Sequence, residues 1–460
     1  MKSWQKISLL ATTALLAFAP VSRVVAEELT QEDLQLLQDV YNSIQSNYIE
    51  EVDKKTLLEG ALKGMVNSVG DQYSEYFDAE TAASFEEDMS ASFEGIGVQF
   101  AIKNGEPVVI SPIDGTPASK AGLQPNDVFV KVGDELLKDK TSQEVVKLIR
   151  GPKGSEVTLT IRRGESLFDV TLVRDTIPNH SVTGELDKEN AEIGYVKITQ
   201  FAQETAKELQ ETIQSLREKG AKRFIFDVRS NPGGLLDQAM KITNMFSEDG
   251  DVMMQVQERS GDAQKYYANG LFGTFKVTEP YVVLIDDGSA SASEIFAAVV
   301  SENTDNPLVG VKTFGKGTVQ NITNQSELGE LKLTIAKWLT PNGEWIHEKG
   351  IEPDVVVERL PVEKAVLLDT KAELKKGQST ETTASLALML NTLGYTVKSD
   401  SYFDDEMEAQ VKAFQKANGF EETGVVTGET AQKLMDDVRA YVTENDVQYQ
   451  KAKELVLKAE

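Results

Sequence analysis

Within residues 177–365, short apolar runs alternate with helical segments, and this alternation constrains the fold more than any other feature of the chain. Three of the runs have the composition of strands, and they are residues 193–198, 223–228 and 281–285. Between the first two, residues 205–219 have the apolar periodicity of an amphipathic helix. Strand–helix–strand order of this kind predicts an α/β domain.

Composition excludes several classes of protein. The chain has 460 residues, enough for roughly three domains. Its net charge of −27 would repel a phosphate backbone, so we expect no nucleic-acid partner. The absence of cysteine excludes disulfides, thiolate metal sites and cysteine nucleophiles. With only His180 and His347 a multi-histidine metal centre is nearly excluded too. We interpret His347 as a structural or surface residue and His180 as a linker residue.

Residues 1–26 have the pattern of a secretory signal peptide. Lys2 and Lys6 precede a short apolar run, residues 7–19, and small or apolar residues follow up to Ala26. The run is short for a membrane span, so we expect cleavage after Ala26, with an uncleaved anchor helix as the alternative. Either way the protein is expected to be exported and to act outside the cytoplasm, at the cell wall or the outer face of the membrane.

Residues 27–90 are expected to be helical. Apolar side chains recur at helical spacing in two segments, within residues 37–48 and 57–65. Two helices this short bury little on their own, so they should pack on another domain or on a second copy of the chain. A homodimer formed through the N-terminal or C-terminal regions and a simple helical cap are both consistent with this pattern.

Residues 91–176 contain several short β patterns, at 108–112, 127–132 and 157–161, and a helical segment at 142–150. The region resembles a PDZ domain. The resemblance is carried by the sequences Gly-Ile-Gly-Val at 95–98, Pro-Ala-Ser-Lys-Ala-Gly-Leu at 117–123 and Ile-Arg-Gly-Pro-Lys-Gly at 149–154.

The resemblance to a PDZ domain implies a site for the free C-terminus of a peptide. Two glycines let successive N–H groups converge on a carboxylate, and the adjacent strand can pair with an extended peptide. The site falls on Gly95, Ile96, Gly97 and Val98.

Residues 370–440 form a small region with a modest apolar core. The segments 393–395, 409–415 and 423–427 resemble the three-helix peptidoglycan-binding domain of cell-wall proteins. A small helical module for another ligand is the alternative. The last segment, residues 441–460, is charged, and we expect a solvated helical tail.

Ser291 occupies a position suited to nucleophilic catalysis. Residues 288–294 follow an expected strand and precede an apolar helical run, residues 295–300. A serine at this junction lies over free backbone N–H groups and the positive end of the helix, which stabilise a developing oxyanion. However, Ser291 and Glu294 also have the Ser-x-x-Glu spacing of a capping box, and this segment alone favours the cap.

Lys316 is a better candidate for the base than either histidine. Gly315 and Gly317 let the backbone around it approach other groups, and residues 306–326 contain no Asp or Glu. To accept a proton, a lysine must change from a pKa of ~10.4 to near neutrality, a difference of ~4 kcal/mol that burial without a carboxylate partner can supply. If the segment is a strand, Gln320 lies on the same face, where its carbonyl could orient the amine.

A phosphate-binding loop is a rival interpretation of the same segment. Residues 310–316 fit the pattern Gly-x-x-x-x-Gly-Lys. The next residue is Gly317, where a magnesium-binding Ser or Thr would be needed, and residues 318–323 are β-rich rather than helical. We therefore reject nucleotide binding.

Together these segments resemble the C-terminal processing peptidase, or tail-specific protease, family of serine peptidases. The resemblance covers nearly the whole mature chain, and it is carried by four motifs: Asp-Val-Arg-Ser-Asn-Pro-Gly-Gly at 227–234, Ser-Ala-Ser-Ala-Ser-Glu at 289–294, Phe-Gly-Lys-Gly-Thr-Val-Gln at 314–320 and Gly-Ile-Glu-Pro-Asp at 350–354. It implies a multidomain α/β protein with N-terminal helices, a β-rich PDZ domain, an α/β peptidase core and a small three-helix C-terminal domain.

The resemblance implies roles for individual residues, and it implies no metal and no cofactor. It assigns Ser291 as nucleophile, Lys316 as general base, Gln320 as the residue that orients the lysine, and the backbone N–H groups of Ala292 and Gly234 as oxyanion donors. Gly233 is the alternative to Gly234. On this basis the nucleophile replaces the cap as the preferred role of Ser291.

The implied protein is an exported serine endopeptidase that recognises the C-terminal tail of a client through its PDZ domain. Arg150 adjoins the turn 151–154, where the family couples the position of the PDZ domain to the active site, so we hypothesise a regulatory role for it. The alternative is a non-catalytic scaffold that binds peptide tails and peptidoglycan. A degenerate scaffold would be expected to lose Ser291 or Lys316, and both are present.

Overall fold

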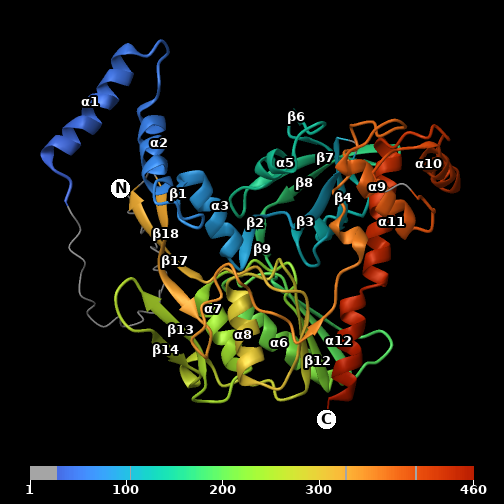
Figure 1. Ribbon diagram of the computed structural model, residues 1–460. Coiled ribbons are helices and arrows are strands. Elements are labelled where there is room, and N and C mark those ends of the chain that lie inside the picture. The colour runs from blue at the N-terminus through green and yellow to red at the C-terminus, as the bar shows by residue number, and fades with distance from the viewer. Residues whose placement is uncertain (1–27, 104, 327–328, 399–400, 460) are drawn as a thin grey trace. The chain divides into compact units, whose positions relative to one another are not determined.

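The computed structural model describes residues 28–103, 105–326, 329–398 and 401–459 (Figure 1). The expected signal peptide, residues 1–26, lies outside the described residues. The chain divides into two compact units. Among the described residues, one unit comprises those within 28–90, 181–354 and 459, and the other comprises those within 91–180 and 355–458.

The α/β domain predicted from the alternation of strands and helices is present in the first unit. Its strands are ordered β10-β11-β12-β15-β16, and all neighbours are parallel except the antiparallel pair β10 and β11. The strands span Val182–Leu186, Ile193–Ile198, Arg223–Asp227, Tyr281–Ile285 and Leu308–Gly310, in chain order. Strands β11, β12 and β15 lie where the apolar runs predicted them.

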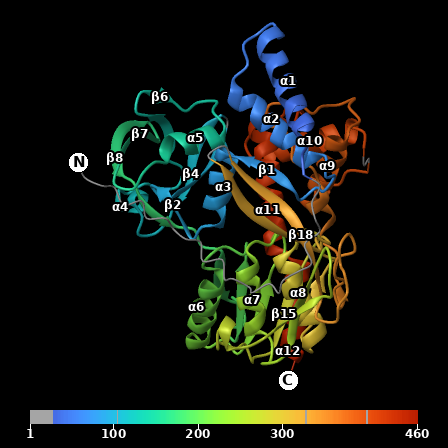
Figure 2. The same cartoon turned by 90° about the vertical axis from the view of Figure 1, so that its left-hand side faces the viewer.

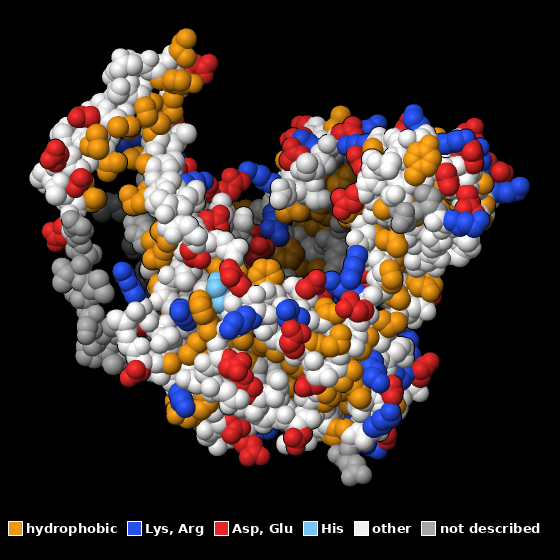
Figure 3. All heavy atoms as spheres, viewed as in Figure 1, with side chains coloured by type: hydrophobic (Ala, Val, Ile, Leu, Met, Phe, Trp, Pro, Cys, Tyr) orange, Lys and Arg blue, Asp and Glu red, His pale blue; other side chains and the backbone are white. Residues whose placement is uncertain are grey.

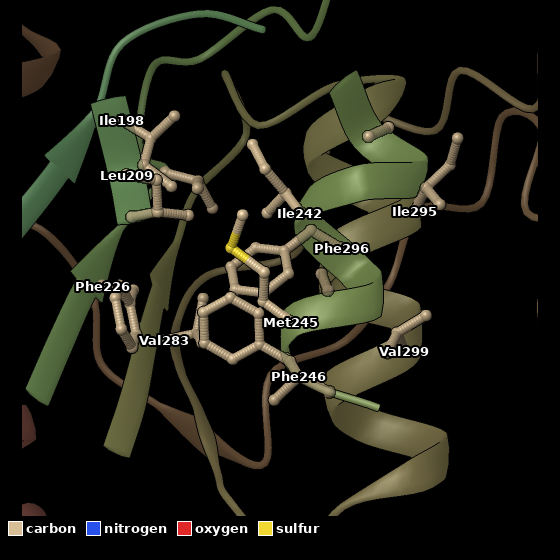
Figure 4. Close-up of a cluster of buried hydrophobic side chains, with 14 of the residues drawn as sticks. Ile198, Leu209, Phe226, Ile242, Met245, Phe246, Val283, Ile295, Phe296 and Val299 are labelled. Atoms are coloured by element: carbon tan, nitrogen blue, oxygen red, sulfur yellow. The ribbon is translucent and has the colours of Figure 1, made fainter. Parts of the chain in front are cut away.

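Three helices of the first unit share one hydrophobic core with this sheet. They are α6 (Thr205–Glu218), α7 (Leu236–Met245) and α8 (Ala292–Asn303). Figure 4 shows Phe246, at the end of α7, between Phe226 of β12 and Phe296 of α8, and its ring contacts both of theirs. Burying an aromatic side chain of this size contributes about 1.5–3 kcal/mol. This core fixes the point where β15 passes into α8.

A second sheet of the first unit is antiparallel. Its order is β1-β18-β13-β14, and β17 also pairs with β18. Figure 2 shows β1 beside β18. The strands are β1 (Glu75–Asp78), β13 (Val252–Glu258), β14 (Gln264–Tyr267), β17 (Thr318–Ser326) and β18 (Gly329–Leu339).

We expect the N-terminal region to be helical throughout, and the structure shows that this expectation is wrong. Helices α1 (Gln31–Asn47), α2 (Lys54–Asn67) and α3 (Ala79–Met89) are present, but β1 lies between α2 and α3. A four-residue strand leaves too short a periodic signal to distinguish it in the sequence. As expected from their length, α1 and α2 contain no buried residue, and hydrophobic side chains gather along the surface of α1 (Figure 3). In the part of the chain that the structure describes, no helix has the length and apolar character needed to span a bilayer.

The second unit begins with the β-rich region expected from the resemblance to a PDZ domain. Its sheet has the order β3-β4-β5-β7-β8, with β6 (Glu135–Leu136) paired to β5, and β2 pairs with β9. Helix α5 (Ser142–Ile149) and the four-residue α4 (Pro117–Lys120) accompany it. The other strands are β2 (Ser92–Gly95), β3 (Val98–Lys103), β4 (Glu106–Pro112), β5 (Val128–Val132), β7 (Glu156–Arg163), β8 (Ser166–Val173) and β9 (Asp175–Pro178).

The C-terminal part of the second unit is helical around its own core. Helices α9 (Glu381–Thr392), α10 (Asp405–Ala417) and α11 (Gly428–Glu444) carry the expected three-helix region. The remaining short elements of the molecule are η1 (Gly270–Phe272), β19 (Val355–Val356) and η2 (Pro361–Lys364).

The last helix, α12 (Val447–Lys458), corrects the expectation of a solvated tail. The side chains of Gln448, Ala452 and Val456 are at most 1% exposed. These residues are four apart, so they form one stripe along the helix. Most other residues of the segment are charged or polar, so its composition predicts a solvated helix and does not reveal the buried stripe.

Candidate active site

Ser291 lies at a sharp turn between β15 and α8. Its backbone has φ 56° and ψ −112°, and helix α8 begins at the next residue, Ala292. A positive φ is uncommon for a residue with a side chain, and such strain persists only where surrounding contacts hold it. A serine on a strained strand-to-helix turn presents its hydroxyl at the end of the sheet.

Hydrogen bonds between Ser291 and Glu294 cap the start of α8, and they use the backbone of Ser291 and the backbone N–H and side chain of Glu294. The Ser291 N–H donates to Oε2 of Glu294 at 2.8 Å, and the Glu294 N–H donates to the Ser291 carbonyl at 2.9 Å. The two residues approach each other as in a capping box, but the Ser291 hydroxyl makes no cap hydrogen bond. Capping therefore leaves the hydroxyl available for another role.

Glu294 joins the serine turn to the lysine loop. Its carboxylate is fully buried and accepts four hydrogen bonds. Oε2 accepts from the N–H groups of Ser291 and Lys316, at 2.8 Å each. Oε1 accepts from the Gly315 N–H at 2.7 Å and from the Thr313 hydroxyl at 2.6 Å. One carboxylate thus fixes two segments that lie far apart in the sequence.

Lys316 lies in the loop before β17, so the condition that Lys316 and Gln320 share one strand is not met. The loop passes close to other backbone. A Cβ on Gly315 would come within 2.9 Å of the Gly350 nitrogen, and one on Gly317 within 2.8 Å of the His347 nitrogen. These approaches explain the glycines on both sides of the lysine. The β-rich segment that follows, rather than a helix, agrees with the rejection of a phosphate-binding loop.

The surroundings of Lys316 lower the pKa of its amine to about 8, and burial is the main cause. The positive charge of Lys332 lowers this pKa further, whereas Glu294 and Asp71 oppose the change. The sequence around Lys316 contains no acidic residue, but the fold brings the carboxylates of Glu294 and Asp71 near its amine. The oxygens of Glu294, however, accept the four hydrogen bonds described above. Within the described residues, no ion pair joins the Lys316 amine to a carboxylate.

Gln320 lies in β17. Its side chain contacts Thr318 and Thr334 rather than the Lys316 amine that we expect it to orient. Its Nε2 donates to Oγ1 of Thr318 at 2.9 Å and to Oγ1 of Thr334 at 3.2 Å. Within the described residues, neither Gln320 nor the Ser291 hydroxyl forms a hydrogen bond with the Lys316 amine. Contacts of this kind are commonly long in an enzyme without substrate and tighten when substrate binds.

The two glycines of the motif at 227–234 have different hydrogen bonds. The Gly233 N–H donates to Oδ1 of Asn231 at 2.9 Å. The N–H groups of Gly234 and Ala292 have no acceptor among the residues that the structure describes. A Cβ on Gly233 would lie 2.8 Å from the Ala292 nitrogen, so the two turns are in close contact. This geometry favours Gly234 over Gly233 as the partner of Ala292.

Asn231 connects the glycine turn to the serine turn, a role that sequence reasoning did not find. Its carbonyl accepts from the Ala290 N–H at 3.0 Å and from the Ser293 hydroxyl at 2.9 Å. Its Nδ2 donates to the Ile198 carbonyl at 2.8 Å, which ties the turn to β11. The motif containing Asn231 was recognised, but only its glycines carried a chemical argument.

Asp227 holds the start of the same motif. Its buried carboxylate accepts from the Tyr195 hydroxyl at 2.6 Å and from the Arg229 guanidinium at 2.7 Å. Burial, followed by the charge of Asp227, raises the pKa of Tyr195 far above its ordinary value. Tyr195 therefore remains a hydrogen-bond donor at neutral pH. The group positions the 227–234 turn and does not reach the serine.

His347 supports the lysine loop, in agreement with its structural interpretation. Its Nδ1 accepts from the Gly317 N–H at 3.3 Å, and its ring stacks on Trp345 with centroids 5.1 Å apart. Trp338 and Trp345 donate from their indole nitrogens to the carbonyls of Lys316 and Gly317, both at 2.8 Å. The described residues contain no group of three or more His, Cys, Asp or Glu arranged to hold a metal ion.

The segment expected to bind a peptide C-terminus lies between β2 and β3 in the second unit. The carbonyl of Ile96 accepts from the Ala118 N–H at 2.8 Å, and that of Gly97 accepts from the Ile113 N–H at 2.9 Å. The N–H groups of Ile96 and Gly97 have no acceptor in the described part of the chain. These two donors, flanked by Gly95 in β2 and Val98 in β3, are suited to a carboxylate.

Arg150 lies at the C-terminal cap of α5, in the second unit. Its guanidinium carbon is 4.8 Å from the centre of the Phe93 ring, a cation–π distance. This contact lies within the unit, so the coupling between the PDZ region and the catalytic residues stays a prediction.

Four family models match the chain. The model described as Peptidase family S41 matches residues 192–357, and a PDZ domain model matches residues 108–163. The model described as "Activating protease CtpB N-terminal domain" matches residues 4–81, and "Putative peptidoglycan binding domain" matches residues 380–434.

Proteins similar over nearly the whole chain carry consistent names. Carboxy-terminal processing protease CtpA of Bacillus subtilis (strain 168) is 44% identical over 423 residues, which is 92% of this chain and 90% of that protein. Carboxy-terminal processing protease CtpB of the same organism is 36% identical over 422 residues, 90% of this chain and 87% of that protein. A solved photosystem II D1 C-terminal processing protease is 24% identical, with a TM-score of 0.42, and covers 72% of this chain and 95% of that one. The chain therefore belongs to peptidase family S41 and is a serine-type protease similar to the carboxy-terminal processing proteases.

Proposed function

We propose that this chain is an exported endopeptidase that cleaves client proteins near their free C-terminus, with Ser291 as nucleophile and Lys316 as general base. One observation carries the proposal. A single oxygen of Glu294 binds the N–H groups of Ser291 and Lys316, and the buried amine of Lys316 has a pKa of about 8. The shared oxygen brings the backbones of the two residues close together, and this supports the pairing of Ser291 as nucleophile with Lys316 as a base that can be uncharged near neutrality.

Acylation begins with a proton transfer from the Ser291 hydroxyl to the neutral Lys316 amine. The serine oxygen forms a bond to the peptide carbonyl carbon, and the carbonyl oxygen becomes an oxyanion. The N–H groups of Ala292 and Gly234 donate to this oxyanion. The Lys316 ammonium then gives its proton to the leaving amine nitrogen as the peptide bond breaks, and an acyl-enzyme remains.

Deacylation repeats the same steps with water. Lys316, neutral again, takes a proton from water as the water oxygen attacks the ester carbon. The tetrahedral intermediate collapses, the serine oxygen leaves, and the ammonium returns its proton to that oxygen. In this scheme Gln320 turns its side chain from Thr318 and Thr334 toward the amine once substrate is bound.

Recognition is assigned to the other unit. The N–H groups of Ile96 and Gly97 bind the carboxylate of the client, and the adjacent strand pairs with its last residues. Arg150 responds to the bound peptide and regulates cleavage.

The exposed apolar side chains of α1, including Leu37 and Val40, pair two copies of the chain. The region that matches the peptidoglycan-binding model retains the protein at the cell wall, after export through the segment at residues 1–26.

The proposed active site is tested by cleavage of an unfolded polypeptide with an apolar free C-terminus. We expect Ser291→Ala and Lys316→Ala each to reduce kcat/KM by at least about 10³-fold, because each removes a member of one catalytic unit. Two matched controls lie nearby: Ser301 is an exposed serine of α8, and Lys312 is an exposed lysine of the same loop.

Ser301→Ala and Lys312→Ala should cleave at the wild-type rate. Full cleavage by either Ser291→Ala or Lys316→Ala would contradict the assignment. Binding of the substrate without cleavage by the wild-type chain would instead favour the scaffold.

A further inference from the structure

A segment of the N-terminal region reaches the proposed base. Tyr73 lies between α2 and β1, and the centre of its ring is 5.0 Å from Nζ of Lys316. The segment is anchored on the second sheet of the same unit. Ser74 accepts a hydrogen bond from the Thr334 N–H at 3.0 Å, and Glu75 pairs with Lys332 across β1 and β18.

The ring of Tyr73 is fixed from two sides. On the backbone side, the carboxylate of Asp71 accepts from the Ser74 hydroxyl at 2.5 Å and from the Tyr73 N–H at 3.4 Å. On the ring side, His347 packs edge-on against Tyr73, with centroids 6.0 Å apart. The same His347 accepts from the Gly317 N–H, next to the lysine. The segment therefore connects directly to the loop that carries Lys316.

We propose that Tyr73 is a positioning residue for the reaction: its ring keeps water from the Lys316 amine and so favours the uncharged amine. This inference rests on the proposed role of Lys316 as base. It makes the segment between α2 and β1 a part of the active site, in addition to any role of the N-terminal region in assembly.

Two effects of the ring oppose each other. An aromatic face near an ammonium stabilises the charged form. Exclusion of water destabilises the charged form. The net result around Lys316 is a fall in pKa from an ordinary 10.5 to about 8, with burial as the largest cause. That burial comes from all the groups around the amine, and the Tyr73 ring, 5.0 Å from Nζ, is one of them. The inference is that the share of the burial supplied by the ring exceeds its attraction for the ammonium.

The charged groups near the amine do not change when Tyr73 is replaced. Lys332 of β18 lowers the pKa of Lys316, and Glu294 of α8 and Asp71 raise it. Burial is the main cause of a raised pKa of the Tyr73 hydroxyl, and the charges of Glu294, Asp71 and Glu348 add to it. Since these groups remain, a change in titration reports the ring itself.

The direct test is a titration of Lys316 that does not depend on cleavage. In the Ser291→Ala background, the rate of acylation of the Lys316 amine by a small reagent is measured against pH by mass spectrometry. The midpoint should rise by about one pH unit or more in Tyr73→Ala, because water reaches the ammonium. Tyr73→Phe keeps the ring, so its midpoint should equal that of the parent.

Tyr73→Gln serves if Tyr73→Ala does not fold, as judged by thermal unfolding. Its polar side chain fills the space but brings a dipole to the amine, so it should also raise the midpoint. Tyr48 is an exposed tyrosine of the same region, and Tyr48→Ala is the control that should change nothing. An unchanged midpoint in a folded Tyr73→Ala or Tyr73→Gln variant would overturn the inference.

Cleavage adds a second measurement in the chain with Ser291 intact. The rising limb of kcat/KM against pH should move to higher pH in Tyr73→Ala, with roughly tenfold lower activity at pH 7 that recovers at alkaline pH. A purely structural defect would lower activity equally at every pH. Retention of cleavage by Lys316→Ala would contradict the proposed base, and the acylation titration would still report on Tyr73.

Discussion

Glu294 illustrates how much one buried residue can decide. Its four hydrogen bonds hold the strained backbone of Ser291 and the loop of Lys316. A buried carboxylate is tolerated only when donors satisfy it, and here three of them are backbone N–H groups. Because those donors use the oxygens, the carboxylate does not pair with the Lys316 amine, and the amine can have a lowered pKa beside a negative charge.

Glu294→Gln should both destabilise the protein and reduce its activity. The amide keeps one acceptor oxygen, and its NH₂ group would face N–H donors of the lysine loop. We expect the free energy of unfolding to fall by about 2–4 kcal/mol and kcat to fall more than KM changes. Denaturant unfolding and cleavage kinetics measure the two effects.

The control is Glu302→Gln, in the same helix, where the carboxylate accepts one exposed hydrogen bond from the Asn342 N–H. Its stability should stay within about 0.5 kcal/mol of the wild type. Equal losses in the two variants would show that Glu294 has no special role.

At the residue scale, the sequence was informative where the chemistry is local. Ser291 and Lys316 were predicted as catalytic residues from the residues beside them and from recognisable motifs, and this assignment stays a prediction. The links made by Glu294 and Asn231, and the approach of Tyr73 to Lys316, join segments distant in the sequence. No periodicity or spacing encodes such contacts, because they depend on how the sheets and helices pack.

At the scale of elements, the strongest sequence patterns gave the correct assignments. Strands β11, β12 and β15 are apolar runs buried in a sheet, and α6 has a full amphipathic period. The short strand β1 and the buried stripe of α12 were missed. Both depend on tertiary neighbours rather than on local propensity.

The turn between β2 and β3 shows why an element can require glycine at one position. Gly97 has φ 74°, and a Cβ there would lie 2.4 Å from the Cβ of Thr116. Gly122 has nearly the same φ, 73°, but open space around it. Replacing Gly122 by alanine therefore adds backbone strain alone, whereas replacing Gly97 adds the same strain and a steric clash with Thr116.

Gly97→Ala should weaken binding of a peptide with a free C-terminus by at least about tenfold, because Thr116 and the turn must move apart. Gly122→Ala carries only the backbone strain of about 1–2 kcal/mol and should bind normally. Fluorescence anisotropy with a labelled peptide measures the affinity, and an amidated peptide tests the carboxylate. Equal affinity of Gly97→Ala and wild type would exclude the turn as the binding site.

At the scale of the whole molecule, chemistry and recognition are assigned to different units. Ser291, Lys316 and their supporting residues lie in the first unit, and the turn at residues 95–98 lies in the second. The motifs of the individual regions predicted catalysis and peptide recognition in different regions, but not that residues 91–180 and 355–458 form one compact unit. The order of regions along the chain did not predict that residues 75–78 join the sheet of the peptidase unit by pairing with β18.

The central claim is that Lys316 acts as an uncharged base, and the pH dependence of kcat/KM tests it most directly. With a pKa of about 8, the amine is mostly protonated at pH 6 and mostly neutral at pH 9. Cleavage by the wild-type chain should therefore rise about tenfold per pH unit at low pH and level off above about pH 8. A rate that is constant from pH 6 to 9, or one that rises only above pH 10, would contradict the account.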